Sequence, residues 1–323
     1  TTITTLSNPI STADLNNPSI TTVLKYLYYD DYAFSGVKTF SNAFSNTQAY
    51  ATNGTTIPAI NWSKRTLGFV TGSSVRILGT NSFLHSTMYY TDEGMPVQIL
   101  ADNTKTGIDI TTSQYHFDGR LLSTSSNHST AGTGYHNYDI LTKQVYDKLG
   151  RVEQVQKKLG SNPFTTIANY VYDDMGRLKT KQLAPGYTGS GKAEMEALAY
   201  SYNIQNQITG INKDYALKTP GLYNKWDNFF GIYLGYDNKD NAFTSGLQNG
   251  QVAGIAWSSQ GDDAQRKYEY TYDNAGRLSN AVFNQKEKPT DGWSNSLINL
   301  SVTGSSGKIS YDLNGNLLGM QQK

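Results

Sequence analysis

The sequence predicts an all-β protein made of consecutive antiparallel β-hairpins that repeat along the chain. Three observations lead to this fold class. A phrase of the form Tyr-Asp-x-x-Gly-Arg-Leu recurs, tyrosine is over-used with 24 copies in 323 residues, and helical periodicity is scarce. Self-similarity at this scale is typical of a stacked array of one supersecondary unit. A composition rich in Tyr, Thr, Ser, Asn and Gly is typical of strands joined by turns.

The repeated phrase occupies residues 146–152, 172–178, 272–278 and 311–317, and the last copy carries Asn316 in place of arginine. Equivalent positions are expected to play the same structural part in every copy. The residues that we assign to this motif are Tyr146, Asp147, Gly150, Arg151, Tyr172, Asp173, Gly176, Arg177, Tyr272, Asp273, Gly276, Arg277, Tyr311, Asp312 and Gly315.

Each copy is expected to be the tip of a hairpin. Asp173 at the first turn position can accept backbone hydrogen bonds, and Gly176 at the fourth can take a positive φ. This is a type I turn closed by a left-handed glycine, a common hairpin loop. Asp173 then faces Arg177 across the strands, and Tyr172 faces Leu178. Because side chains alternate between faces, we expect the tyrosines on one face and the Asp–Arg pairs on the other.

Weaker copies fill the gaps between the clear ones, and the glycine position of the turn tracks them along the chain. The position is filled by Gly94, by Gly119 in a shortened copy at residues 117–121, by Asn206 and by Asp240. Asn and Asp tolerate the left-handed region better than other residues with a side chain. The spacing between copies varies, which indicates insertions in the loops of the array.

The chain divides into two parts by pattern. We expect residues 1–80 to form a lead-in segment, partly irregular with a few strands, and residues 81–323 to form the repeat array. The array stops just after a hairpin turn, so we expect it to be truncated at its carboxyl end, as a fragment of a longer polypeptide. Strands are expected at 22–32, 74–79 and 83–90, a helix of two turns at most at 192–198, and insertions at 183–196 and 212–230.

Composition narrows the classes of function. Charged residues make up 16% of the chain and the net charge is +1, so no basic surface points to a nucleic acid. Cysteine is absent, which excludes disulfides, thiolate metal sites and a cysteine nucleophile. No apolar run is long enough to span a bilayer. We expect no cofactor, no metal and no catalytic activity.

Residues 186–192 match the first seven positions of a phosphate-binding loop, but Ala193 stands where a Mg²⁺-binding Ser or Thr is needed. No buried apolar strand precedes the segment, so we interpret it as a flexible loop between hairpins. Residues 237–241 resemble part of a Ca²⁺ loop without its order of ligands, and we interpret them as a turn. The histidines His85, His116, His128 and His136 do not have metal-ligand spacing, and we expect them to be structural.

The aromatic residues leave a second function open. Tyr268, Tyr270 and Tyr272 alternate along one expected strand, so one face of the sheet carries a tyrosine stripe. Such stripes are more often sheet packing than binding platforms. Together with tryptophan, however, they could form an adhesive or carbohydrate-binding surface. The tryptophans are Trp62, Trp226, Trp257 and Trp293.

The phrases over about residues 83–323 resemble the YD repeats of the bacterial RHS (rearrangement hot spot) family, which animal teneurins share. The lead-in at residues 27–34 is also similar to that family. The resemblance implies a curved, spiralling sheet that forms part of a hollow β-shell. In the family the shell encloses a variable C-terminal polypeptide, often a toxin used between competing cells. The shell often ends in an Asp-Pro-x-Gly self-cleavage motif, and no Asp-Pro occurs here.

The resemblance therefore implies a non-catalytic structural segment of a secreted or cell-surface bacterial shell. Its implied partners are the remaining repeats of the parent polypeptide and an enclosed cargo, or secretion machinery. A glycan is the partner under the alternative function. The direction of the tyrosine face distinguishes the two functions, because packaging needs it to line a cavity and adhesion needs it to be exposed.

Overall fold

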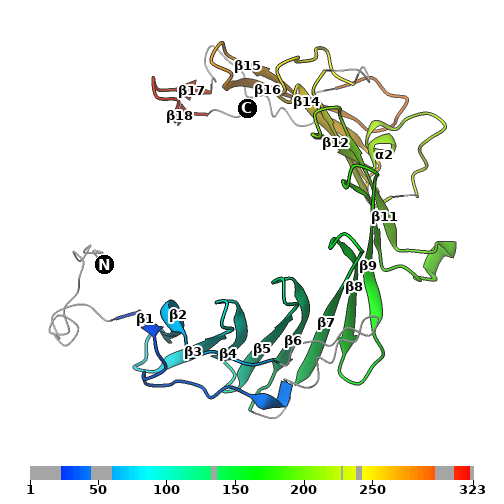
Figure 1. Ribbon diagram of the computed structural model, residues 1–323. Coiled ribbons are helices and arrows are strands. Elements are labelled where there is room, and N and C mark those ends of the chain that lie inside the picture. The colour runs from blue at the N-terminus through cyan, green and yellow to red at the C-terminus, as the bar shows by residue number, and fades with distance from the viewer. Residues whose placement is uncertain are drawn as a thin grey trace. The chain divides into compact units, whose positions relative to one another are not determined.

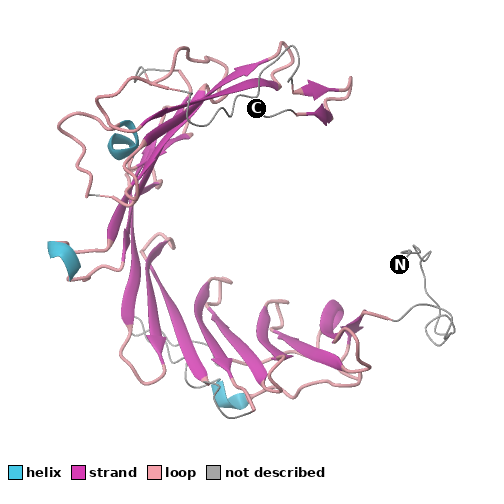
Figure 2. Cartoon of the chain, turned by 180° about the vertical axis from the view of Figure 1, so that it is seen from behind, coloured by secondary structure: helices cyan, strands magenta, loops and turns pink. Residues whose placement is uncertain are grey.

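A computed structural model describes residues 23–44, 60–131, 137–226, 228–237, 242–294 and 309–320. Of these residues 49% lie in strands and 4% in helices, which confirms the all-β hairpin array (Figure 2). The strand expected from residue 22 begins at Lys25, and residues 1–22 lie outside the described residues.

Sixteen strands form one antiparallel sheet in which the strand order follows the chain, and two further strands form a separate hairpin (Figure 1). Such an order means that each strand pairs with its neighbours in sequence. The strands are β1 Lys25–Asp30, β2 Thr66–Arg76, β3 Phe83–Tyr90, β4 Pro96–Asp102, β5 Ile108–Tyr115, β6 Leu121–His128, β7 Tyr138–Tyr146, β8 Val152–Leu159, β9 Thr165–Tyr172, β10 Leu178–Leu183, β11 Glu196–Tyr202, β12 Ile208–Ile211, β13 Phe230–Gly235, β14 Gly254–Ser259, β15 Gln265–Tyr272, β16 Leu278–Lys286, β17 Ser310–Tyr311 and β18 Leu317–Gly319. The helical elements are η1 Asn42–Phe44, η2 Gly189–Gly191 and α2 Lys213–Leu217.

The chain forms two compact units, residues 1–166 and 167–323. Strands β1 and β2 of the expected lead-in belong to the sheet of the first unit, where β2 pairs with β3. The division expected at residue 80 stays a prediction.

In the first unit, the segments between β1 and β2 cover one face of the sheet. Tyr89 of β3 and Leu100 of β4 are 4% and 1% exposed and pack with Ile60. Tyr32 stacks on Tyr89 with ring centroids 4.6 Å apart, and Trp62 meets the same ring edge-on at 4.9 Å. The aromatic residues of the lead-in therefore cover this core on the side away from the sheet.

A buried glutamine connects the lead-in segment to the sheet by hydrogen bonds. Gln98 is fully buried, and its Oε1 accepts a hydrogen bond from the Ser41 N–H at 2.7 Å. Its Nε2 donates to the Ser41 carbonyl at 3.0 Å and to Thr112 Oγ1 at 2.9 Å. A buried amide is costly unless its hydrogen bonds are made, so Gln98 fixes where the lead-in crosses the sheet.

In the second unit, α2 lies on the face that carries Tyr233 and Ala256 of β13 and β14, which are 2% and 1% exposed. Gly231 makes this close approach possible. A Cβ there would lie 2.6 Å from the Asn212 carbonyl oxygen and 2.8 Å from the Ala216 nitrogen. The helix is part of the insertion expected at residues 212–230, which had no helical pattern.

The helix expected at residues 192–198 is wrong. Glu196 to Leu198 belong to β11, where Leu198 pairs with Lys181 of β10. Helix propensity over seven residues is a weak signal, and the ladder of strand hydrogen bonds overrides it. No helix among the described residues is long and apolar enough to cross a membrane.

We expect Leu100→Ala to lower the free energy of unfolding by about 2–5 kcal/mol, since it leaves a cavity under the lead-in. Leu78→Ala removes the same atoms from a side chain that is 78% exposed, and should cost less than about 0.5 kcal/mol. Chemical denaturation followed by circular dichroism measures both. Equal effects would contradict the position of the core.

Candidate functional site

The turn of each copy has the geometry that the motif predicts. The Gly176 N–H donates to the Asp173 carbonyl at 2.9 Å, and the Asp173 N–H donates to the Arg177 carbonyl at 2.8 Å. Tyr172 faces Leu178 across β9 and β10. The four glycines of the clear copies all have positive φ, at 79° for Gly150, 80° for Gly176, 76° for Gly276 and 84° for Gly315. Gly94, Gly119 and Asn206 share this conformation.

The aspartate of the motif holds the turn from inside. Asp147 Oδ1 accepts the N–H groups of Leu149 and Arg151, both at 2.9 Å, and its Oδ2 accepts Arg151 Nε at 2.7 Å. The backbone N–H and the guanidinium of Arg151 keep the pKa of the Asp147 carboxyl below its ordinary value. Asp173 and Asp273 make the same three contacts, and Asp312 accepts the N–H groups of Asn314 and Asn316 and the side-chain amide of Asn316.

The tyrosine of the motif connects each hairpin to the hairpin before it. The Tyr202 hydroxyl donates to the main-chain carbonyl of Leu178 at 2.9 Å, at the position that follows the arginine of the previous copy. Burial raises the pKa of Tyr146 and of Tyr272, so these hydroxyls remain protonated donors. The same bond joins Tyr90 to Val70, Tyr115 to Pro96, Tyr146 to Leu121, Tyr236 to Ile208, Tyr272 to Val252 and Tyr311 to Leu278, at 2.6–3.2 Å.

The arginine of the motif reaches forward to the next copy. The Arg177 guanidinium lies over the ring of Tyr202, with its carbon 4.7 Å from the ring centre, and Nη1 donates to Asn206 Oδ1 at 2.9 Å. Arg120 and Arg277 stack in the same way on Tyr146 and Tyr311, at 5.0 and 4.8 Å. These three arginines thus each bridge an aspartate of their own turn and the following tyrosine. We call this set of contacts, the tyrosine hydroxyl on a carbonyl and the arginine on the tyrosine, the latch.

Two expectations about the motif are corrected by these contacts. The arginine and the next tyrosine share a contact, so they are not separated onto opposite faces. The copy at residues 117–121 is also not shortened. His116 donates its N–H to the Arg120 carbonyl and takes the place of the aspartate, while Tyr115 is the latch tyrosine.

The structure shows two copies that an insertion divides. Gly250 has φ +80°, Gln207 Nε2 donates to its carbonyl at 3.3 Å, and Gln251 Nε2 donates to the Gly276 carbonyl at 2.6 Å. Gly250 therefore fills the turn position of the copy that begins at Tyr236. Asp240, which we expected there, lies outside the described residues.

The other divided copy is the first. The Gly68 N–H donates to Asp30 Oδ1 at 2.6 Å, and Gly68 has φ +84°. Tyr29 faces Val70, and Phe69 occupies the arginine position and packs on the ring of Tyr90 at 4.9 Å. Residues 31–67 separate the two halves of this motif. The sequence Gly-x-Val at Gly68 and at Gly250 is the part of the motif that could have revealed these two copies. It was not recognised because no Tyr-Asp pair stands four residues before either glycine.

The other candidate motifs take structural positions. Lys192 Nζ donates to the Trp226 carbonyl at 2.7 Å, and the loop leads from η2 into strand β11. The segment therefore lacks the helix whose amino end faces phosphate in a phosphate-binding loop. His85 contacts Ser74, His116 contacts Asp118 and His128 contacts Asp109, at 2.8, 2.9 and 2.5 Å. No group of three metal-ligating residues occurs among the described residues; His136 and residues 238–241 lie outside them.

One ionic cluster had no signal in the sequence. The Lys218 side chain is 2% exposed, and its Nζ lies 2.5 Å from Asp263 Oδ1 and 4.1 Å from the ring centres of Tyr215 and Tyr223. Desolvation lowers the pKa of Lys218. The Tyr223 hydroxyl donates to both oxygens of Asp263, at 2.6 and 2.8 Å. The cluster fastens the segment after α2 to the turn between β14 and β15.

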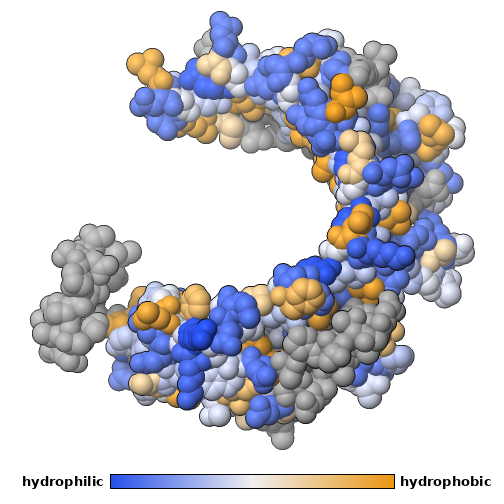
Figure 3. Space-filling model, viewed as in Figure 1, coloured by the Kyte–Doolittle hydropathy of each residue, from blue (hydrophilic) through white to orange (hydrophobic). Residues whose placement is uncertain are grey.

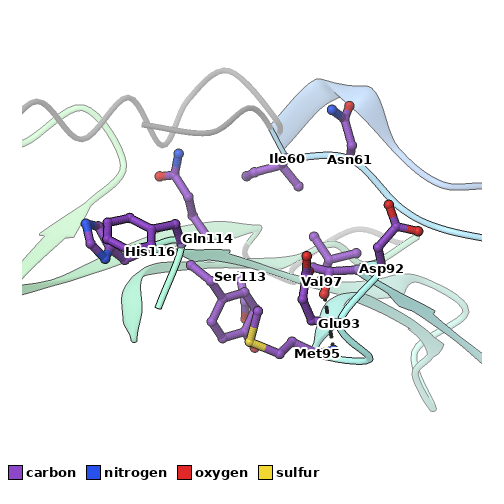
Figure 4. A pocket seen from close by; sticks show the side chains of 12 residues that line it. Ile60, Asn61, Asp92, Glu93, Met95, Val97, Ser113, Gln114 and His116 are labelled. Atoms are coloured by element: carbon purple, nitrogen blue, oxygen red, sulfur yellow. Dashed lines mark hydrogen bonds between the residues drawn. The ribbon is translucent and has the colours of Figure 1, made fainter. Parts of the chain in front are cut away.

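A cavity of about 290 Å³ lies between two consecutive turns of the first unit (Figure 4). Asp92, Glu93 and Met95 line it from one turn and His116 from the next, while Ile60 lies above. Ser63 Oγ donates to Asp92 at 2.5 Å, so this carboxylate already binds the lead-in. The cavity follows from the stacking of adjacent turns under the lead-in.

No protein-family profile matches the sequence, and no curated protein matches it. Several solved structures are similar to the chain, including the following two. One is a crystal structure of TcdB2–TccC3–Cdc42, at 11% identity and a TM-score of 0.29, where the match covers 80% of this chain and 17% of that chain. The other is a porin-like protein from Bacteroides uniformis, at 13% identity and a TM-score of 0.22, covering 61% and 87%. The chain thus spans under a fifth of the first structure's length, and likeness at these scores carries no argument about function.

We expect Gly176→Ala to cost about 1 kcal/mol or more of stability, since a Cβ is disfavoured at its φ of +80°. Gly261→Ala is the matched control, because Gly261 is outside the positive-φ set and has open space around its Cβ position. It should leave the free energy of unfolding unchanged or raise it slightly. Denaturant titration compares the two, and equal effects would refute the assigned turn.

We expect stability to fall on acidification. The pKa of Asp147 and of Asp273 is lower in the folded chain than in the unfolded chain. Their contribution is therefore complete above the unfolded value of about 3.9 and is lost as pH falls below it. Asp147→Asn with Asp273→Asn should reduce the slope of stability against pH below about 4. Asn keeps an acceptor for the turn, as Asn203 does naturally. An unchanged slope would contradict the prediction.

Proposed function

We propose that this chain is a non-catalytic structural segment of a secreted RHS-type shell that encapsulates or presents a polypeptide, such as a toxin. The resemblance of the repeated phrase to YD repeats supports the family assignment. The latch is the single observation that carries the functional class. A tyrosine hydroxyl bonds seven of the described copies to the copy before, and three arginines lie over the tyrosine of the next copy.

The latch uses the chemical groups that a binding or catalytic site would need. The Tyr202 hydroxyl donates a hydrogen bond to a main-chain carbonyl. The Arg177 guanidinium binds Asp173 and lies over the Tyr202 ring. These groups do not converge on a pocket. Nearest-neighbour contacts of one kind, repeated along the chain, build a surface whose area grows with the number of copies. A large continuous surface is what a container needs.

The alternative function, an adhesive or carbohydrate-binding surface, has less support. Sugar platforms need exposed rings with hydrogen-bonding groups at their edges. Trp62 packs in the core of the first unit, and Trp257 stacks with Tyr268 at 5.8 Å. Trp226 is 64% exposed and Trp293 is 36% exposed, with two lysines over its ring. Trp226 is therefore the residue on which the alternative depends.

The proposed partners are further repeats of the parent polypeptide and an enclosed cargo, and the proposed location is the bacterial exterior or cell surface. Limited proteolysis of the protein as its host makes it, with its natural flanking sequence, tests this. We expect the flanking cargo to resist protease in the wild type. The combined change Tyr146→Phe, Tyr202→Phe and Tyr272→Phe should expose it, because each change removes one latch hydrogen bond of about 1 kcal/mol.

Tyr187→Phe is the control, since Tyr187 is 43% exposed and lies outside the motif. Circular dichroism should show that the latch variant still folds. Rapid cleavage of the flanking sequence in the wild type would contradict encapsulation. Saturable binding on a glycan array that Trp226→Ala abolishes would instead favour the adhesive function.

A further inference from the structure

Large apolar side chains recur at the tips of the hairpins, next to the latch but outside it. In the first unit, Leu67, Phe117 and Leu149 are 87%, 85% and 77% exposed. Each lies one or two residues before the glycine of its turn. The second unit repeats the pattern with Met175, Ile204 and Leu313, at 67%, 93% and 105%. On the face drawn in Figure 3, orange apolar residues are scattered among blue polar residues.

The fold does not require apolar residues at these positions. The central positions of a type I turn accept most residues, and polar residues are common in turns. A side chain that is more than two-thirds exposed gains almost nothing from burial in this chain. Single exposed apolar residues are ordinary, but their recurrence at the two central positions of a repeated turn indicates a common external contact.

The internal hydrogen bonds of the turns lower the free-energy cost of moving them from water into an apolar medium. At the fourth turn of the first unit, Asp147 and its carbonyl accept the N–H groups of Leu149, Gly150 and Arg151 at 2.9–3.0 Å. The Arg151 guanidinium neutralises the carboxylate at 2.7 Å. An unpaired N–H or charge would be expensive in an apolar medium. The tip therefore presents its apolar side chain above a turn in which three backbone N–H groups are already hydrogen-bonded.

The spacing of the tips favours a lipid surface over a protein partner. Adjacent hairpins lie about 10 Å apart, at about 4.8 Å per strand, so Leu67 and Phe117 project as separate points with the polar turn of Asp92 and Glu93 between them. A stable protein–protein interface buries about 1,200–2,000 Å² around a continuous apolar centre, which separate tips do not supply. A lipid interface accepts each side chain independently of its neighbours.

We propose that the turn edge of the first unit binds a lipid bilayer by inserting Leu67, Phe117 and Leu149 into the interface. Exposed basic residues flank two of these tips, Lys64 and Arg65 near Leu67 and Lys148 beside Leu149, where they meet lipid headgroups. Asp92 and Glu93 occupy the one intervening turn that has no large apolar tip, and this turn stays in water. The contact is peripheral and needs no spanning segment.

Vesicle co-sedimentation of the whole chain tests the proposal, with phosphatidylcholine vesicles and with vesicles that also contain phosphatidylglycerol. We expect binding to both, stronger to the second. Phe117→Ser with Leu149→Ser should lower the partition coefficient at least ten-fold. Leu78→Ser with Leu159→Ser is the matched control, because these residues are 78% and 54% exposed and lie at the opposite ends of hairpins in the same unit. It should change binding less than two-fold.

Three results would overturn the proposal. One is a wild-type chain that binds neither vesicle, and another is an equal loss in the two double variants. The third is binding to phosphatidylglycerol alone that Lys64→Gln with Lys148→Gln abolishes and the tip variant does not, which would be simple charge attraction. Sedimentation velocity identifies a second copy of the chain as the occupant if self-association depends on the same tips while vesicles do not bind.

Discussion

The contact on which the rest of the structure depends is the latch between consecutive hairpins. A two-stranded hairpin is marginal in water and needs neighbours to be stable. Strand pairing alone can slip in register, especially in strands as polar as β6, whose sequence is Leu-Leu-Ser-Thr-Ser-Ser-Asn-His. The tyrosine hydroxyl of one copy donates to one particular main-chain carbonyl of the copy before it. The arginine of that earlier copy lies over the ring of the same tyrosine. The latch therefore fixes register at the turn edge, where the side-chain pattern of the strands specifies it weakly.

The energetics agree with a repeated, modest contact. A net hydrogen bond contributes about 0.5–1.5 kcal/mol, and an arginine over an aromatic ring about 0.5–2 kcal/mol. Neither would hold a hairpin by itself, and both act only between neighbours. Substitutes at the arginine position keep the forward reach by other means, such as Phe69 on the Tyr90 ring and Gln251 on the Gly276 carbonyl. The contact with the next copy is thus retained at positions where the charge is lost. This indicates that the position of the side chain, rather than ion pairing, is what the latch requires.

Local chemistry made part of this structure predictable. The turns at Gly150, Gly176, Gly276 and Gly315 followed from the residues at each turn position, because a left-handed glycine and an accepting aspartate act within five residues. The divided copies at Gly68 and Gly250 did not follow, since their two halves meet only in space. The short helix α2 and the Lys218–Asp263 pair depend on burial by distant segments. No local pattern records such contacts, and the same holds for the reach of each arginine to the next copy.

The insertions show which parts of the sheet can vary while the latch contacts are kept. In both divided copies the extra residues enter between the aspartate and the glycine. Among the described residues of each insertion, aromatic side chains pack on the face opposite the latch. In the first unit Tyr89 faces the lead-in while its neighbour Tyr90 makes a latch bond, and adjacent residues of a strand point to opposite faces. In the second unit Phe243 packs on Tyr233 at 5.7 Å, and Tyr236 forms the latch. Because Asp30 binds the Gly68 N–H across the gap, the turn closes whatever its loop contains. The sheet can therefore vary its loops and one face without losing the contacts that hold its hairpins in order.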